Sequence, residues 1–323
     1  MNRLEVLSPD GVPEVRAGDD LVDLFLTAID GEVEVADGDV VVVTSKVVSK
    51  AEGRVRSGDR DGALAAETAR VVARRGPTTI VRTRHGFTMA AAGIDASNVE
   101  LGSIVLLPLD PDASARALRA TLRERTGRNV GVIVTDTAGR AWREGQTDMA
   151  VGAAGLLVAE EYAGRTDPHG NPLAVTAPAV ADEIAGAAEL AQGKLAGRPF
   201  ALVRGRADLV LPAGEDGPGA VALVRAEGGD LFGFGAREAV VRALAGDPAD
   251  RRPFGAPASA DELADALRLV TGADVRLEDG GLRVAVPHSG AWPGAVAALA
   301  FAHGWVVGDN QDPNVAHLLP PGP

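Results

Sequence analysis

The chain has 323 residues, 46% of them apolar, which is enough for about two folded domains. Its formal charge is −13 and no basic cluster stands out, so we expect no nucleic-acid partner. Cysteine is absent, which excludes disulfides, thiolate zinc sites and cysteine nucleophiles. No apolar run reaches the roughly 18 residues of a membrane span, and the first residues do not resemble a secretion signal. We therefore expect a cytoplasmic protein without a membrane partner.

The first 245 residues alternate between short apolar runs and amphipathic stretches, which predicts an α/β layout of mixed α+β type. The expected strands are residues 40–48, 79–84, 104–108, 129–135 and 200–204. The expected helices are residues 21–28, 63–75, 114–126, 179–191 and 235–245. We interpret residues 1–245 as one domain.

A smaller C-terminal α+β domain is expected after a linker. Residues 246–258 are rich in Gly, Pro and charge without periodicity, which is typical of a linker. Residues 259–323 then predict an α-β-β-α-β order, with a Ser259 to Glu262 capping box and a hairpin turn at Asp279-Gly280. We expect Trp292 and Trp305 in the core of this domain. The sequence does not indicate its role.

Lysine is rare in this chain, and its distribution points to chemistry. Of 32 basic residues only three are lysines, and Lys46 and Lys50 lie together in "TSKVVSKAEGR". They share one face in either a strand or a helix. With Ser45 and Ser49 they supply the ammonium and hydroxyl donors that hold phosphate oxygens. The alternative is an edge strand that its lysines protect from aggregation.

Two carboxylates follow apolar runs. Asp95 lies in "AAGIDASNVE", and Asp136 follows "NVGVIVT" with Thr137 next to it. Mg²⁺ prefers oxygen ligands, usually one or two carboxylates and the phosphates of a substrate. These residues and the lysines predict a site for a nucleotide phosphate and a metal. Alternatively, Asp95 caps a turn or a helix and Asp136 is a turn residue.

A polar segment follows the second carboxylate. Arg140, Arg143, Gln146 and Asp148 either grip an anionic substrate or form a solvated loop. The five histidines lack metal-ligand spacing. The sequence contains no P-loop and no G-x-G-x-x-G fingerprint, so a nucleotide would bind outside these frameworks.

Six motifs in collinear order, from about Val12 to Val210, resemble the coenzyme F420-0:L-glutamate ligase family. They are "TSKVVSKAEGR", "AAGIDASNVELGS", "LPLDPDASA", "TGRNVGVIVTDTAGRAWREGQTDMAVGAAG", "DPHGNPLAVT" and "AVADEIAGAAELAQGKLAGRPFALVRG". The resemblance implies the F420 gamma-glutamyl ligase-like fold and an intertwined homodimer. It implies a ligase that uses GTP and a divalent metal, Mg²⁺ or Mn²⁺, to add L-glutamate to F420-0 through an acyl phosphate. Extension of the γ-linked tail, and K⁺ as a monovalent cofactor, also follow from the resemblance.

The resemblance also assigns roles to residues. The positions similar to GTP-binding residues are Val12, Pro13, Glu14, Val15, Ser45, Lys46, Lys50 and Asn98. The positions similar to metal ligands are Asp95, Asp136 and Thr137. Asp95, Asp136 and Lys50 are the expected catalytic residues.

Two features depart from the family. Archaeal members are expected to carry an acidic ligand of a second metal in the stretch equivalent to "AQGKLAG", where this chain has Lys194. The sequence is therefore compatible with either one or two bound metal ions. Long actinobacterial members resemble fusions with a flavin-binding domain, whereas the residues after Ala258 do not resemble it, so we expect no flavin. The competing functions are a metal-dependent phosphatase or kinase and a non-catalytic F420-binding protein.

Overall fold

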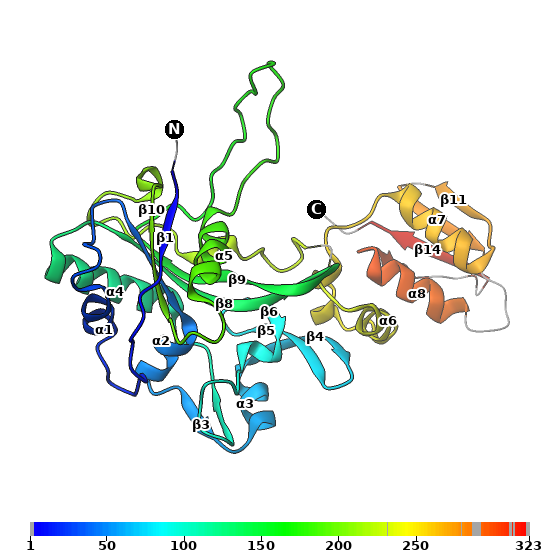
Figure 1. The fold of residues 1–323 in the computed structure, drawn as a ribbon. Coiled ribbons are helices and arrows are strands. Elements are labelled where there is room, and N and C mark those ends of the chain that lie inside the picture. The colour runs from blue at the N-terminus through cyan, green and yellow to red at the C-terminus, as the bar shows by residue number, and fades with distance from the viewer. Residues whose placement is uncertain are drawn as a thin grey trace. The chain divides into compact units, whose positions relative to one another are not determined.

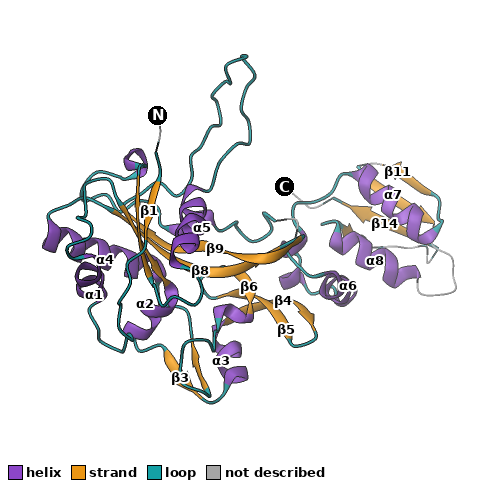
Figure 2. Cartoon of the chain, viewed as in Figure 1, coloured by secondary structure: helices purple, strands orange, loops and turns teal. Residues whose placement is uncertain are grey.

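The computed structural model divides the chain into two compact units, Met1–Val71 with Ile80–Val224, and Val72–Thr79 with Arg225–Pro323. Each unit combines helices with β-sheet, so the expected mixed α/β class is confirmed (Figure 1, Figure 2). The expected linker, residues 246–258, lies within the second unit. The structure describes residues 3–230, 232–278, 280–285, 292–309, 312 and 314–320.

A five-stranded mixed sheet forms the frame of the first unit, with the order β1-β10-β2-β8-β9. Only β2 and β8 are parallel among its described pairs. Its strands are β1 Glu5–Leu7, β2 Val40–Thr44, β8 Gly131–Arg140, β9 Arg143–Ala154 and β10 Phe200–Arg204. Residues 40–43, 131–134 and 200–203 of the central strands form buried apolar runs because both faces of the sheet are covered there.

Alternate residues of β2 face different helices. Val41 and Val43 belong to the same core cluster as residues of α1 (Leu21–Ile29) and α4 (Pro111–Thr126). Val40 and Val42 pack in a second cluster with α5 (Val180–Gln192). The period of two in a strand therefore separates two apolar cores.

Close packing of α4 on β9 depends on a glycine. A Cβ atom at Gly152 would lie 2.2 Å from the carbonyl oxygen of Pro111 at the start of α4. Asp110 caps this helix, since its Oδ1 accepts from Ala113 N at 2.9 Å. The residues at both ends of α4 also suit the ends of a helix: Pro111 occupies the first turn, and Gly127 adopts φ 70° after the last turn.

Most expected elements are confirmed, and two are wrong. The strand expected at residues 40–48 ends at Thr44, and helix α2 (Ser45–Ala51) begins directly after it. The helix expected at 63–75 is α3 (Arg60–Glu67) followed by strand β4 (Thr68–Arg75). β4 lies in a sheet of order β4-β5-β6, so strand pairing prevails over the helical pattern of the sequence.

Other strands differ in length from the expectation. The strand expected at 129–135 continues as β8 to Arg140, because β9 pairs with it over its whole length. The polar segment after Asp136 therefore forms the outer end of the β8–β9 hairpin, with residues in both strands, and is not a loop. The remaining strands of this region are β3 Val55–Ser57, β5 Thr78–Thr83, β6 Thr88–Ala90 and β7 Ser103–Val105.

Between β9 and α5 the chain makes a long excursion, which we call the arm, residues 159–178. Figure 1 shows it as the green loop that extends away from the sheet. Its two limbs are joined by backbone hydrogen bonds, including Tyr162 N to Thr176 O at 3.1 Å and Leu173 N to Arg165 O at 2.8 Å. The arm thus has an ordered backbone although its Val175 side chain is 93% exposed.

The second unit has its own sheet and core. Its sheet has the order β11-β12-β14-β13, and its core includes Leu263, Leu267, Val284, Trp305 and Leu318. Trp292 packs against this core, as expected. Its elements are α6 Ala236–Ala245, α7 Ala260–Thr271, β11 Val275–Glu278, β12 Gly281–Ala285, α8 Trp292–Ala302, β13 Val306–Val307 and β14 Val315–Leu319.

Two local features of the second unit match the expectations from the sequence. Ser259 Oγ accepts from Glu262 N at 3.2 Å, which confirms the N-terminal cap of α7. β11 and β12 form the expected hairpin, although Asp279 lies outside the described residues. Strand β14 was not expected.

Among the helices that the structure describes, none is both long enough and apolar enough to cross a membrane.

Candidate active site

The residues that the family resemblance assigns to nucleotide or metal binding all line one cleft of about 660 Å³ in the first unit, whereas Ser49 does not. They are Val12, Pro13, Glu14, Val15, Ser45, Lys46, Lys50, Asp95, Asn98, Asp136 and Thr137. Residues that are far apart in the sequence thus share one cavity. Their individual roles remain predictions.

The central polar contact of the cleft arises from the parallel pair β2 and β8. Thr44 at the end of β2 lies opposite Thr135 of β8. The next residues, Ser45 and Asp136, are therefore neighbours, and Ser45 Oγ donates to Asp136 Oδ1 at 2.9 Å. The apolar run turns polar at Ser45 because the strand ends there and a helix begins at the wall of the cleft.

Lys46 and Lys50 lie one turn apart on α2 and both line the cleft. The Lys46 ammonium lies 2.6 Å from Asp95 Oδ2 and donates to Ser97 Oγ at 2.6 Å. The Lys50 ammonium donates to Glu14 Oε1 at 2.5 Å and to the carbonyl oxygen of Asn98 at 2.6 Å. The two lysines thereby connect α2 with both loops that carry predicted nucleotide-binding residues.

A strained turn presents Asp95 to the cleft. Ala91, Ala92 and Gly93 have φ of 49°, 55° and 73°, and Asn98 has φ 54°. Alanine rarely adopts this left-handed conformation, and such strain concentrates at functional sites. The carboxylate of Asp95 is held by Ser97, whose backbone N donates to Oδ1 at 2.8 Å.

The two aspartates have opposite pKa shifts. Burial raises the pKa of Asp95, but hydrogen bonds from Lys46 and Ser97 and the charge of Lys46 outweigh it, and the pKa falls to about 2. Burial raises the pKa of Asp136 to about 7, and the negative charges of Asp148 and Asp95 add to this effect against the hydrogen bond from Ser45. Asp136 thus lacks a counter-charge that Asp95 has.

The other wall of the cleft is formed by β8, β9 and the C-terminal end of α5. Asp148 of β9 is buried and accepts from Thr135 Oγ1 at 3.0 Å and from Thr137 Oγ1 at 2.7 Å. The Lys194 ammonium donates to Thr137 Oγ1 at 2.7 Å and lies 3.6 Å from Glu189 Oε1. Burial and the charge of Asp148 raise the pKa of Glu189.

Some polar residues of the sequence analysis do not join the site. Gln146 and Asp148 line the cleft, whereas Arg140 and Arg143 do not. Arg140 lies near the turn of the β8–β9 hairpin, where its Nη2 donates to the carbonyl oxygen of Glu144 at 3.1 Å. Conversely, sequence reasoning missed Glu189 and Gln192, because an acid and an amide on a helix carry no signal of their own.

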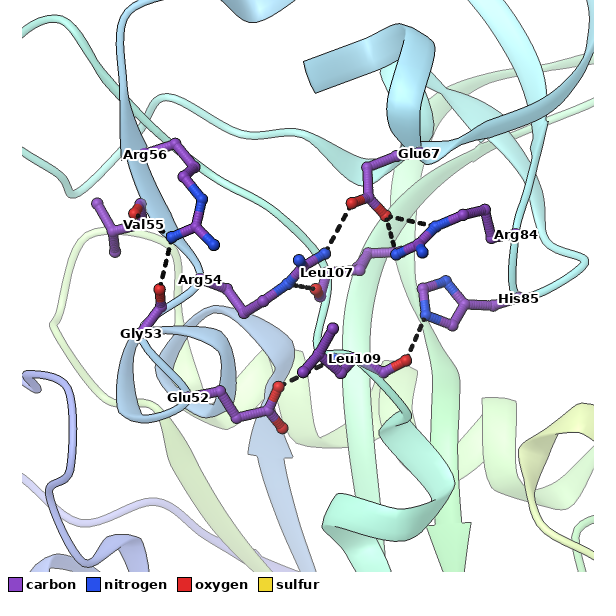
Figure 3. A network of polar contacts seen from close by, with 10 residues as sticks. All are labelled: Glu52, Gly53, Arg54, Val55, Arg56, Glu67, Arg84, His85, Leu107 and Leu109. Carbon is purple, nitrogen blue, oxygen red and sulfur yellow. Dashed lines mark hydrogen bonds and ion pairs between the residues drawn. The ribbon is translucent and has the colours of Figure 1, made fainter. Parts of the chain in front are cut away.

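A buried ion-pair network supports the loop that follows α2 (Figure 3). Arg54 donates to Glu67 Oε1 at 2.8 Å and to the carbonyl oxygen of Leu107 at 3.0 Å, and Arg84 donates to Glu67 Oε2 at 2.9 Å. Glu52 accepts from Leu109 N at 2.9 Å. Glu52 and Arg54, at the end of the lysine motif, are thus structural: they connect the end of α2 with α3 and with the segment before α4.

The donor set of the cleft fits a hard divalent cation. Within the described ranges, no three His, Cys, Asp or Glu side chains are arranged as a preformed metal cage. Asp95, Asp136 and the Thr137 hydroxyl line one cavity and supply only oxygen donors. Mg²⁺ and Mn²⁺ commonly take one or two carboxylates and fill the remaining positions with phosphates and water.

Comparisons with known proteins show the family of this chain. The family model described as F420-0:Gamma-glutamyl ligase matches residues 11–61 and 62–205. A protein of Archaeoglobus fulgidus named coenzyme F420:L-glutamate ligase is 42% identical over 223 residues, or 63% of this chain and 88% of the relative. Proteins of the same name from Methanothermobacter thermautotrophicus and Methanopyrus kandleri are 38% and 39% identical. These matches cover 62% and 72% of this chain and 89% and 100% of the two relatives.

A polar cleft at the end of two parallel strands, in a chain whose relatives are named as ligases, makes this protein an enzyme of the ligase class. The chain belongs to the F420-0:gamma-glutamyl ligase family, which confirms the resemblance of its motifs. The matched range contains all the predicted site residues.

Proposed function

We propose that this protein adds L-glutamate to coenzyme F420-0 with GTP as co-substrate and then extends the γ-linked glutamate tail. The observation that carries the proposal is the convergence of Lys46, Lys50, Asp95 and Asp136 on one cleft, within the range that matches the ligase family. Lysine ammonium groups suit phosphate, and carboxylates suit the metal that accompanies a triphosphate.

Each residue would have a distinct task in binding. Lys46, Lys50 and the Ser45 hydroxyl would hold phosphate oxygens of GTP, and the segment Val12–Val15 with Asn98 would border the nucleotide. Asp95, Asp136 and the remaining lone pair of Thr137 Oγ1 would hold Mg²⁺ or Mn²⁺. A bound metal would screen the repulsion between the phosphates and the carboxylate of the acceptor.

The chemistry would proceed in two transfers. A terminal carboxylate oxygen of F420-0 attacks the γ-phosphorus of GTP, so that GDP leaves and an acyl phosphate forms. The amine of glutamate then attacks the acyl carbon, phosphate leaves, and the nitrogen loses a proton to give the amide. Residues of the cleft contribute mainly by holding charged groups close together and by electrostatic stabilisation.

The product again ends in a carboxylate, so the same site would serve for tail extension. K⁺ is the proposed monovalent cofactor, and the cytoplasm, where GTP is supplied, is the proposed compartment. We propose the F420 gamma-glutamyl ligase-like fold as an intertwined homodimer, in which the arm packs against a second copy. The 93% exposure of Val175 on an ordered arm supports this, because such apolar side chains suit an interface.

Mass spectrometry of F420-0 incubated with the protein, GTP, Mn²⁺ and L-glutamate tests the function. We expect mass increases by whole glutamyl units, with GDP and phosphate formed only when both acceptor and glutamate are present. GDP formation without glutamate would instead indicate a phosphatase if phosphate is released, or a kinase if the phosphoryl group stays on an acceptor. Binding of F420-0 without any metal-dependent product would indicate a non-catalytic binding protein.

A further inference from the structure

The Lys194 side chain enters the cleft at the wall opposite α2. Lys194 follows the C-terminal end of α5, and its ammonium donates to Thr137 Oγ1 at 2.7 Å. Glu189 Oε1 of the same helix lies 3.6 Å from this ammonium. Thr137 is the residue next to Asp136, so a positive charge of the protein lies beside the proposed metal ligands.

Besides Arg60, the other cations that line the cleft are engaged elsewhere. Lys46 pairs with Asp95, and Lys50 pairs with Glu14. Arg198 forms two hydrogen bonds with Asp10, at 2.7 and 3.0 Å. The wall that holds Asp148 and Glu189 therefore receives its positive charge from Lys194.

A second observation shows that this wall is built for a polar ligand. The side chain of Gln192 lines the same cleft and is only 2% exposed. Neither its amide nitrogen nor its amide oxygen has a hydrogen-bond partner among the described residues. An unpaired buried amide is unfavourable, so these atoms are available for a charged or polar group in the cleft.

We propose that Lys194 is the second cation of this active site, so that the ligase works with one divalent metal ion, held by Asp95 and Asp136. This inference rests on the proposed function and specifies the ion content of the same cleft. The ammonium is bonded to Thr137 Oγ1, whose own proton goes to Asp148 Oδ1. The ion held by Asp95 and Asp136 would take the remaining lone pair of Thr137 Oγ1, and the two carboxylates would offset the Lys194 charge. A further divalent ion at this wall would find Thr137 fully used and Asp148 engaged by two threonines, and would meet the Lys194 charge at close range.

Counting bound Mn²⁺ tests the proposal without relying on turnover. Free Mn²⁺ is titrated by electron paramagnetic resonance in the presence of a saturating non-hydrolysable GTP analogue, for the full-length chain. The variants are Lys194→Glu, which places a third carboxylate beside Asp148 and Glu189, and Lys194→Arg, which keeps the charge. Lys194 is 64% exposed in its side chain, so these substitutions leave the core untouched. Arg123→Glu on α4, outside the cleft, changes the net charge by the same amount as Lys194→Glu.

We expect one Mn²⁺ per chain for the unaltered protein, for Lys194→Arg and for Arg123→Glu, and two for Lys194→Glu. Two ions in the unaltered protein, or one ion of unchanged affinity in Lys194→Glu, would overturn the role of Lys194 while leaving the proposed ligase function in place. Absence of Mn²⁺ and nucleotide binding in the unaltered protein would overturn both.

Discussion

Ser45 Oγ and Asp136 Oδ1 are 2.9 Å apart although 91 residues separate them in the sequence. The contact follows from the parallel register of β2 and β8, in which Thr44 lies opposite Thr135. The C-terminal end of β2 and the interior of β8 therefore bring a hydroxyl and a carboxyl to the same point. The proposed function makes this point the place where metal and nucleotide meet.

Replacing Asp136 by Asn should abolish glutamylation without disturbing the fold. The amide is isosteric but cannot serve as an anionic ligand, and we expect activity to fall by at least about 100-fold. Product formation is measured by mass spectrometry and folding by circular dichroism. Asp30→Asn, at an exposed position at the end of α1, is the matched control and should retain activity. Near-normal activity of the Asp136 variant would refute the assignment.

Stability of the metal-free protein should depend on the titration of Asp136. Burial raises the pKa of the folded-state carboxyl to about 7, whereas the ordinary pKa of the unfolded carboxyl is 3.8. Between these values the folded state holds a proton that the unfolded state has lost, so stability decreases as pH rises from about 4 to about 7.

Melting temperatures of the unaltered chain and of Asp136→Asn from pH 4 to pH 8 isolate this contribution. The difference should favour the variant increasingly up to about pH 7 and then stay constant. Metal binding should also release protons in this range, which calorimetry in buffers of different ionisation enthalpy detects. A pH-independent difference would contradict the raised pKa.

Replacing Lys46 by Met should weaken GTP binding. The substitution removes a charged donor that now pairs with Asp95 at 2.6 Å, and hydrogen bonds to charged groups contribute roughly 1.5–3 kcal/mol. We expect GTP affinity to fall about 10- to 100-fold by calorimetry. Lys46→Arg should lose less, and Arg123→Met outside the cleft should lose nothing. Unchanged affinity in Lys46→Met would show that the lysine does not contact the nucleotide.

The ion pairs of Glu67 should be structural. Its side chain is 8% exposed and binds both Arg54 and Arg84, so Glu67→Gln leaves buried charge uncompensated (Figure 3). Breaking a buried pair costs roughly 3–5 kcal/mol. Scanning calorimetry should show a lower melting temperature for this variant, with activity retained well below that temperature. An unchanged melting temperature would mean that solvent or relaxation compensates for the lost charge.

The arm should determine the oligomeric state. Val175→Asp places a charge on the proposed interface, so we expect the dimer to dissociate, as measured by light scattering after size exclusion. Leu101→Asp, at another fully exposed apolar position of the first unit, is the control and should leave the mass unchanged. A dimeric Val175 variant would place the interface elsewhere, and a monomeric unaltered protein would refute the dimer.

Periodicity was sufficient wherever a segment buries one clear face. The strand at 200–204 and the helices near 114–126 and 179–191 follow directly from such patterns. It was insufficient for Ser45–Ala51 and Thr68–Arg75, where apolar and polar residues suit a helix and a strand equally well. Long-range pairing decided both segments: β2 ends next to the start of its antiparallel partner β10, where Val43 lies opposite Phe200, and β4 pairs with β5.

By itself, the sequence determined the mixed α/β class, the family, and the set of lysines and aspartates that line the cleft, because short motifs carry these residues in a recognisable order. Only the tertiary structure decided that Asp148, Glu189 and Gln192 join them, that Arg140 and Arg143 do not, and that Lys194 bonds to Thr137. The physical reason is that burial, charge pairing and hydrogen-bond partners arise between segments, and no local pattern records which segments will meet.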